Sequence, residues 1–254
     1  MANVLVNDAS LQDIADAIRE KNGTEETYKP AEMGAAVRAI ESGDNFYDAF
    51  WDAYQENGNR KDYINAFGTS STGANIWNDS NFKPKYDIKP RDAASMFYNS
   101  KITDLVKILE EQGVVFDTSQ VTGNTTYMFG QCSELTTVPP IDFTSAKYLT
   151  GCFMNCKKLK KITLLNFHSD IQIKNNPFGV CEALEELVIT GEIGMSVSLV
   201  QSPLLNNTSV QNIIDCLADM TGQTAQTLTL HTDVKAKLTE TQIAAITGKN
   251  WTLA

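Results

Sequence analysis

The chain has 254 residues, and its 31 acidic residues outnumber its 21 basic ones, which leaves a formal net charge of -10. That length suits one elongated domain or two small ones. The acidic balance argues against nucleic acid as a partner, because binding to phosphate backbones needs clustered lysine and arginine. No apolar run reaches the ~18 residues of a membrane span, and residues 1–8 do not resemble a secretory signal, so we expect cytoplasmic synthesis without membrane insertion.

Residues 1–43 predict a helical hairpin. Ser10 and Asp13 form a capping signal before an apolar face, and Pro30 begins a second helix at its first turn. Two amphipathic helices this short need a partner surface. Three partners remain open: the rest of the chain, an identical subunit in a homo-oligomer, or another protein of an assembly.

Residues 44–90 are rich in aromatic side chains. Four of them, from Tyr47 to Tyr54, recur at i, i+3, i+4 and i+7 and line one face of a predicted helix. We interpret this stretch as an N-terminal cap over the apolar end of the repeats that follow. The alternative is that some of these side chains, above all Trp77, contact a glycan or a protein, because Trp and Tyr are enriched in binding surfaces.

A repeated motif, Phe-x-x-Cys-x-x-Leu-x-x-Ile/Val, organises the middle of the chain. Clear copies begin at Phe129, Phe153 and Phe178, which are 24 and 25 residues apart, and weaker copies begin at Phe97 and Leu205. A repeat of that length indicates that one small structural unit recurs along the chain.

The end of each clear copy alternates as a half-buried strand does, for example between Leu159 and Leu164. The linkers at 116–119, 141–145 and 165–169 hold Asp, Asn, Thr and Ser, which predict turns. Because one unit cannot bury its own apolar face, we expect the units to stack and to pair their strands in a parallel sheet. The predicted fold class is therefore α/β, with a solenoid of stacked repeats over 91–254.

The region from about residue 205 predicts a helical C-terminal cap. Ser209 is the expected start of a helix that ends near Gly222, and a strand follows at Thr227 to Leu230. Thr239 to Gln242 form a capping box that begins another helix, and Trp251 to Leu253 predict the last strand.

Three of the five cysteines, Cys132, Cys156 and Cys181, occupy one position of the repeat. Cysteine is a small, readily buried hydrophobe, so we interpret this ladder as packing. A disulfide or a zinc site is the alternative, and Cys152 with Cys156 is the one close pair, but no histidine lies near it in sequence.

Lysine-rich and glutamate-rich segments occupy equal positions in two successive copies. Aligning the repeats sets lysines beside glutamates, at Lys157 with Glu182, Lys160 with Glu185 and Lys161 with Glu186. Such cross-strand pairs stabilise a sheet and disfavour a register slip. The alternative is a binding patch on the exposed face of the sheet, with candidate binding residues Thr137, Lys161, Thr163, Glu186 and Val188.

The sequence offers no catalytic constellation. Of its two histidines, His168 stands where the preceding linker has Thr144, and His231 follows a predicted strand. Neither has a nucleophile and base arrangement around it in sequence. We therefore assign no catalytic, cofactor-binding or metal-binding residue and do not expect an enzyme.

The repeats resemble BspA-type leucine-rich repeats, which carry the same Phe, Cys, Leu and Ile positions, and their Met-Phe variant at Met96-Phe97 and Met128-Phe129. The resemblance covers 91–190 and implies a leucine-rich-repeat solenoid. Repeats of this type serve adhesins, surface proteins and phage proteins, so they do not specify one function.

Residues 11–33 are similar to N-terminal segments of tail-region proteins of phages and prophages of Gram-positive gut bacteria. This resemblance implies a non-enzymatic, virion-associated tail-region protein that presents its repeats to a protein or glycan ligand and contacts other tail proteins through 1–43. The alternative is a BspA-like surface or secreted adhesin.

Overall fold

The computed structural model describes Asp16, Pro84 and residues 86–254. The chain divides into two compact parts, Met1–Ala53 and Tyr54–Ala254, and all the described residues except Asp16 belong to the second. Asp16, on the polar side of the first predicted helix, is helical and exposed. The remaining predictions for residues 1–43 and 44–83, Trp77 included, lie outside the described residues.

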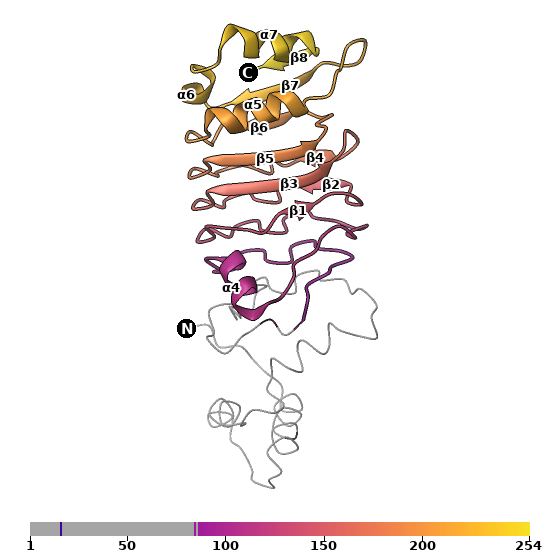
Figure 1. Ribbon diagram of the computed structural model, residues 1–254, viewed down its shortest axis with the longest axis vertical. Coiled ribbons are helices and arrows are strands. Elements are labelled where there is room, and N and C mark those ends of the chain that lie inside the picture. Colours follow the sequence, from indigo (N-terminus) through magenta and orange to yellow (C-terminus); the bar gives the residue numbers. More distant parts are fainter. Residues whose placement is uncertain (1–15, 17–83, 85) are drawn as a thin grey trace, which may run out of the picture. The chain divides into compact units, whose positions relative to one another are not determined.

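The described part is a mixed α/β structure built from small parallel sheets (Figure 1). One sheet has the order β1 (Ile141–Asp142), β3 (Lys161–Phe167), β5 (Glu186–Gly191). A second sheet pairs β2 (Tyr148–Thr150) with β4 (Gln172–Lys174). The third has the order β6 (Val197–Leu199), β7 (Gln226–Leu230), β8 (Trp251–Leu253).

The strands pair at the spacing of the sequence repeat. In the ladder of β3 with β5, Lys161 lies opposite Glu186 and Ile162 opposite Leu187, which confirms the predicted strands and their register. The predicted turns are partly wrong, because β1 and the end of β3 extend into the linkers. The strand continues there through a bulge at Asn166, whose φ of 54° lets the extra residue fit.

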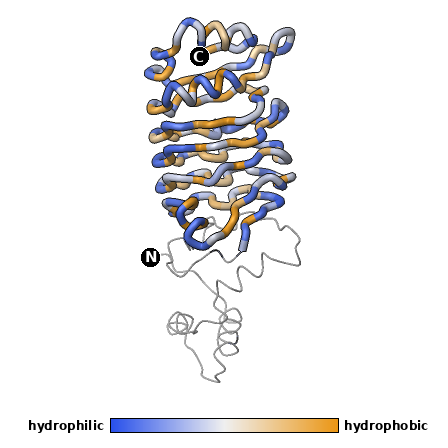
Figure 2. Tube along the Cα trace, viewed as in Figure 1, coloured by the Kyte–Doolittle hydropathy of each residue, from blue (hydrophilic) through white to orange (hydrophobic). Residues whose placement is uncertain are grey.

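The repeated phenylalanines stack in the core. The rings of Phe97 and Phe129 are 5.0 Å apart, those of Phe129 and Phe153 5.7 Å, and those of Phe153 and Phe178 6.2 Å, with interplanar angles of 9°, 6° and 7°. Hydrophobic stretches recur along the described chain in Figure 2. Because each ring is buried against the next, the units are joined by packing as well as by strand pairing.

The packing interpretation of the cysteine ladder is confirmed. The Sγ atoms of Cys132, Cys156 and Cys181 donate to the carbonyl oxygens of Phe97, Phe129 and Phe153, at 2.9, 3.1 and 3.3 Å. All three are fully buried, and burial raises the pKa of the Cys181 thiol to about 12. All five cysteines are free thiols.

The two weaker copies of the repeat end in helices where the clear copies end in strands. Helix α4 (Leu105–Gln112), which the sequence did not predict, begins after Asp104, whose carboxylate accepts from Lys107 N at 2.9 Å. Helix α5 (Asn207–Cys216) begins after Asn206, so the predicted cap at Ser209 is wrong. Asn206 Oδ1 accepts from Ser209 N, whereas the Ser209 side chain is directed to a strand.

The C-terminal predictions are largely confirmed. Helix α7 (Glu240–Gly248) begins with the capping box of Thr239 and Gln242, and strands β7 and β8 lie where predicted. The sequence did not predict the short helix α6 (Thr232–Lys235), which His231 caps by accepting from Asp233 N at 3.2 Å. None of the helices in the described part is long and apolar enough to cross a bilayer.

Candidate functional site

The predicted binding residues lie on the outer face of the β1, β3 and β5 sheet. Their strand neighbours Ile162, Leu164, Leu187 and Ile189 are buried, and side chains alternate along a strand, so the candidates point away from the core. Lys161 is exposed, whereas Thr163, Glu186 and Val188 are half-buried. Thr163 lies directly opposite Val188, one step along the strands from the Lys161 and Glu186 pair.

Thr137 continues this face in the preceding repeat. Lys160 N donates to Thr136 O at 3.2 Å, which aligns Thr137 with Lys161. The Thr137 hydroxyl donates to the carboxylate of Asp104, the residue that also caps α4. The five described candidates therefore occupy one face in three successive repeats, and Thr137 is held by the start of α4.

The charged ladder on this face is largely satisfied within itself. Lys161 Nζ is 2.9 Å from Glu186 Oε2, as the alignment of the repeats predicts. Lys158 Nζ is 2.5 Å from Glu134 Oε2 in the preceding repeat, a pair that the sequence did not predict. Exposed ion pairs contribute about 0–1 kcal/mol each. The ladder therefore specifies register more than it offers free charge to a ligand.

A polar row that the sequence did not predict lies beside the ladder. Asn166 Nδ2 donates to Asp142 Oδ2 at 3.0 Å, and Asn166 N donates to Thr190 Oγ1 at 2.9 Å. Burial alone would raise the pKa of Asp142, but hydrogen bonds from Thr144 and Asn166 outweigh it and lower the pKa. The signal in the sequence was the recurrence of a polar residue every 24 positions, at 142, 166 and 190.

Helix α5 closes the outer edge of β5 with side chains. Ser209 Oγ accepts from Leu187 N at 3.0 Å, and Asn212 Oδ1 accepts from Ile189 N at 2.7 Å. Asn212 Nδ2 also donates to Ile189 O at 3.0 Å. These groups replace the backbone of a further strand, so the face ends at α5 without a bare strand edge.

The histidines have structural partners. His168 Nε2 lies 3.0 Å from Ala146 O and its Nδ1 contacts the Asp170 carboxylate. Because a carbonyl oxygen only accepts, Nε2 carries the hydrogen in this arrangement. The contact with His168 lowers the pKa of Asp170. His168 thus fastens its linker to the preceding one.

A hollow beside that linker is lined by Asp170, Glu192 and Asp219 among others. The carboxylates of Asp170 and Asp219 have partners, since hydrogen bonds from Thr221 lower the pKa of Asp219 as His168 does that of Asp170. Within residues 84 and 86–254, no three His, Cys, Asp or Glu side chains gather as metal ligands do.

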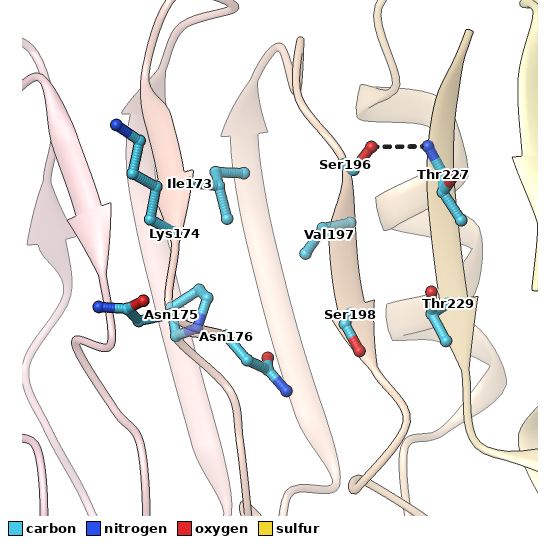
Figure 3. A pocket seen from close by; sticks show the side chains of 10 residues that line it. Ile173, Lys174, Asn175, Asn176, Ser196, Val197, Ser198, Thr227 and Thr229 are labelled. Atoms are coloured by element: carbon cyan, nitrogen blue, oxygen red, sulfur yellow. Dashed lines mark hydrogen bonds between the residues drawn. The ribbon is translucent and has the colours of Figure 1, made fainter.

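A second groove lies on the other side of the repeats, between β4 and β6 (Figure 3). It has a volume of about 200 Å³ and is lined by Ile173, Lys174, Asn175, Asn176, Pro177, Ser196, Val197, Ser198, Thr227 and Thr229. Ser196 Oγ accepts from Thr227 N at 2.9 Å and ties β6 to β7. The sequence did not predict this groove, because it depends on how two neighbouring strands fail to pair.

Comparison of the chain with protein-family models, with curated proteins and with solved structures finds no match.

Proposed function

We propose that residues 91–254 form a BspA-type leucine-rich-repeat solenoid and that the chain is a non-enzymatic binding or structural protein. The observation that carries this proposal is the placement of equivalent residues, Thr137, Lys161 and Glu186, side by side on one exposed face in three successive repeats. The stacked phenylalanines and the parallel pairing at the repeat spacing support the solenoid. Such repeated faces are typical surfaces for recognition.

The residue types that most often carry catalysis support the non-enzymatic proposal through their contacts. His168 is held by Ala146 O, and His231 caps α6. Burial raises the pKa of the thiols of Cys132, Cys156 and Cys181, so these thiols stay protonated and are poor nucleophiles.

The biological setting that we propose is a phage or prophage tail region, with the repeats directed to a protein or glycan ligand. The resemblance of residues 11–33 to tail-region proteins supports it, and we assign 1–43 to contacts with other tail proteins or with a second copy of the chain. The second candidate is a BspA-like adhesin, supported by the same repeats.

Antibody detection in the source cells distinguishes the two settings. Particles released on lysis are purified on a density gradient and probed, in parallel with intact washed cells. We expect the chain to sediment with the particles. Its presence on intact cells and its absence from the particles would refute the tail proposal in favour of the adhesin.

Light scattering tests the role assigned to residues 1–43. Molar mass in solution is measured for the full chain and for a shortened chain that begins at Asp44. We expect an oligomer for the full chain and a monomer for the shortened one. Two monomers would contradict self-assembly through 1–43 and leave contacts with other proteins as its role.

A further inference from the structure

We propose that the groove between β4 and β6, together with the tyrosine ridge beside it, binds a neutral oligosaccharide. The ridge consists of Tyr98 and Tyr127. This inference rests on the proposed recognition function and gives it a ligand class and a location. The location lies on the opposite side of the repeats from the β1, β3 and β5 face.

The groove exists because neighbouring strands differ in which side chains they bury. The two repeats pair along β3 and β5, where a shift of 25 residues relates Lys161 to Glu186. The same shift would set Ile173 opposite Ser198. Ile173 pairs with the buried Leu149 in β2 and belongs to the inner face, but in β6 the buried residues are the neighbours of Ser198, namely Val197 and Leu199.

A shift of one residue exchanges the two faces of a strand, so β4 and β6 cannot pair without exposing one apolar set. The repeats are therefore held together at β3 and β5 and separate at β4 and β6. Ile173 and Val197 point toward each other across the gap and form its apolar part (Figure 3).

The strand edges present hydrogen-bonding groups to this gap. Gln172 N donates to Lys147 O at 2.9 Å, and Lys174 O accepts from Gly151 N at 3.1 Å, so both residues bond toward β2. Because successive residues of a parallel strand bond to opposite sides, the N–H and C=O of Ile173 face the gap. A ligand with both donors and acceptors can engage them.

Asn176 adds an acceptor for which the described residues supply no donor. Its side chain extends from the end of β4 into the space before β6 (Figure 3). Its Oδ1 atom is buried and has no hydrogen-bond partner among the described residues. Buried polar atoms nearly always have a partner, and a hydroxyl group of a ligand in the groove would supply one.

The tyrosine ridge continues the groove. Tyr127 lies so close over Gly151 that a Cβ atom there would be 2.3 Å from the ring, and its hydroxyl accepts from Asn175 Nδ2 at 3.1 Å. Tyr98 meets it edge-on at 6.0 Å and is 36% exposed. Asn175 and Asn176 therefore connect the aromatic rings to the groove. The C–H groups of a sugar ring pack against the electron-rich face of an aromatic ring.

The lining favours an uncharged sugar. Of the ten lining residues only Lys174 is charged, and its side chain extends away from the groove in Figure 3. The chain's net charge of -10 disfavours anionic polysaccharides. The volume of about 200 Å³ equals that of roughly seven water molecules at liquid density. That space suits one sugar ring better than a peptide strand of several residues.

Isothermal titration of the full chain tests the proposal. The probes are maltotetraose, cellotetraose, tetra-N-acetylchitotetraose and a linear galactotetraose at millimolar concentration, with tetragalacturonate as the anionic comparison. We expect at least one neutral tetrasaccharide to bind, and Asn176→Ala and Tyr98→Ala each to weaken its Kd at least about tenfold. The control Lys161→Ala, on the other sheet face, should leave the Kd unchanged.

Several results would overturn the inference: no binding by any of the neutral probes, binding by tetragalacturonate alone, or binding that both groove variants leave intact. A Thr-Val-Thr-Val-Thr-Val-Thr peptide is titrated as well, and protection of the Ile173 amide by this peptide would identify a strand-binding edge instead. Far-ultraviolet circular dichroism checks the fold of each variant.

If Asn176→Ala does not fold, Ser198→Val removes a hydroxyl from the groove in its place and should weaken binding by a similar factor. The outcome is separable from the proposed function. Loss of sugar binding with the chain still present in particles refutes this inference alone, whereas sugar binding by a chain found only on cells refutes the tail setting alone.

Discussion

Replacing Asn212 with alanine removes the side chain that closes the edge of β5. The amide of Asn212 both accepts from Ile189 N and donates to Ile189 O, at 2.7 and 3.0 Å. A hydrogen bond contributes about 1 kcal/mol net, and a buried group left without a partner costs about 1–3 kcal/mol. Since Ile189 is 3% exposed and the asparagine half-buried, we expect a loss of about 2–3 kcal/mol in the free energy of unfolding.

Urea unfolding measures this loss, and hydrogen exchange locates it. In Asn212→Ala the Ile189 amide should exchange at least about tenfold faster, while the Leu187 amide, which Ser209 Oγ accepts, stays protected. Ser209→Ala should have the reciprocal effect on Leu187. Thr208→Ala, at an exposed position of α5, is the control and should change neither amide.

The reasoning is refuted if Asn212→Ala leaves the protection of the Ile189 amide unchanged. Equal loss of protection at Leu187 and Ile189 in both variants would also contradict it, because α5 would then act only by packing. A change in the urea m value would indicate altered compactness and not the loss of two hydrogen bonds.

Three further predictions follow from the same contacts. A double-mutant cycle of Lys161→Ala and Glu186→Ala should give a coupling of about 0.2–1 kcal/mol that falls as salt is added, and an absent or salt-independent coupling would contradict the ion pair. Gly191→Ala should destabilise far more than Gly113→Ala, because a Cβ at Gly191 would lie 1.9 Å from a backbone oxygen whereas none lies within 4 Å at Gly113; similar urea midpoints for the two variants would refute this. Because burial raises the pKa of the Cys181 thiol from its ordinary value near 9 to about 12, its contribution to stability is complete below pH 9 and is lost as pH rises toward 12. The decline approaches about 1.4 kcal/mol per pH unit for this thiol, so Cys181→Ala should show a shallower alkaline loss of stability in urea titrations.

The spacing of residues in the sequence determined the repeated core. A buried Phe and Cys recurring every 24 or 25 residues specify which side chains face inward, and aligning the copies correctly predicted that Lys161 lies opposite Glu186. The capping box at Thr239 was equally readable. These features could be predicted because each depends on residues within one repeat or on the offset between two copies.

Tertiary structure alone decided where the repeats stop pairing. Whether Asn212 would close the edge of β5, or Asp104 would start a helix in place of a strand, depends on contacts between segments far apart in the chain. The groove between β4 and β6 has the same origin, because a one-residue difference in which side chains point inward becomes visible only when the two strands are set side by side. Local periodicity records what each strand buries, whereas pairing depends on whether its neighbour buries the matching face.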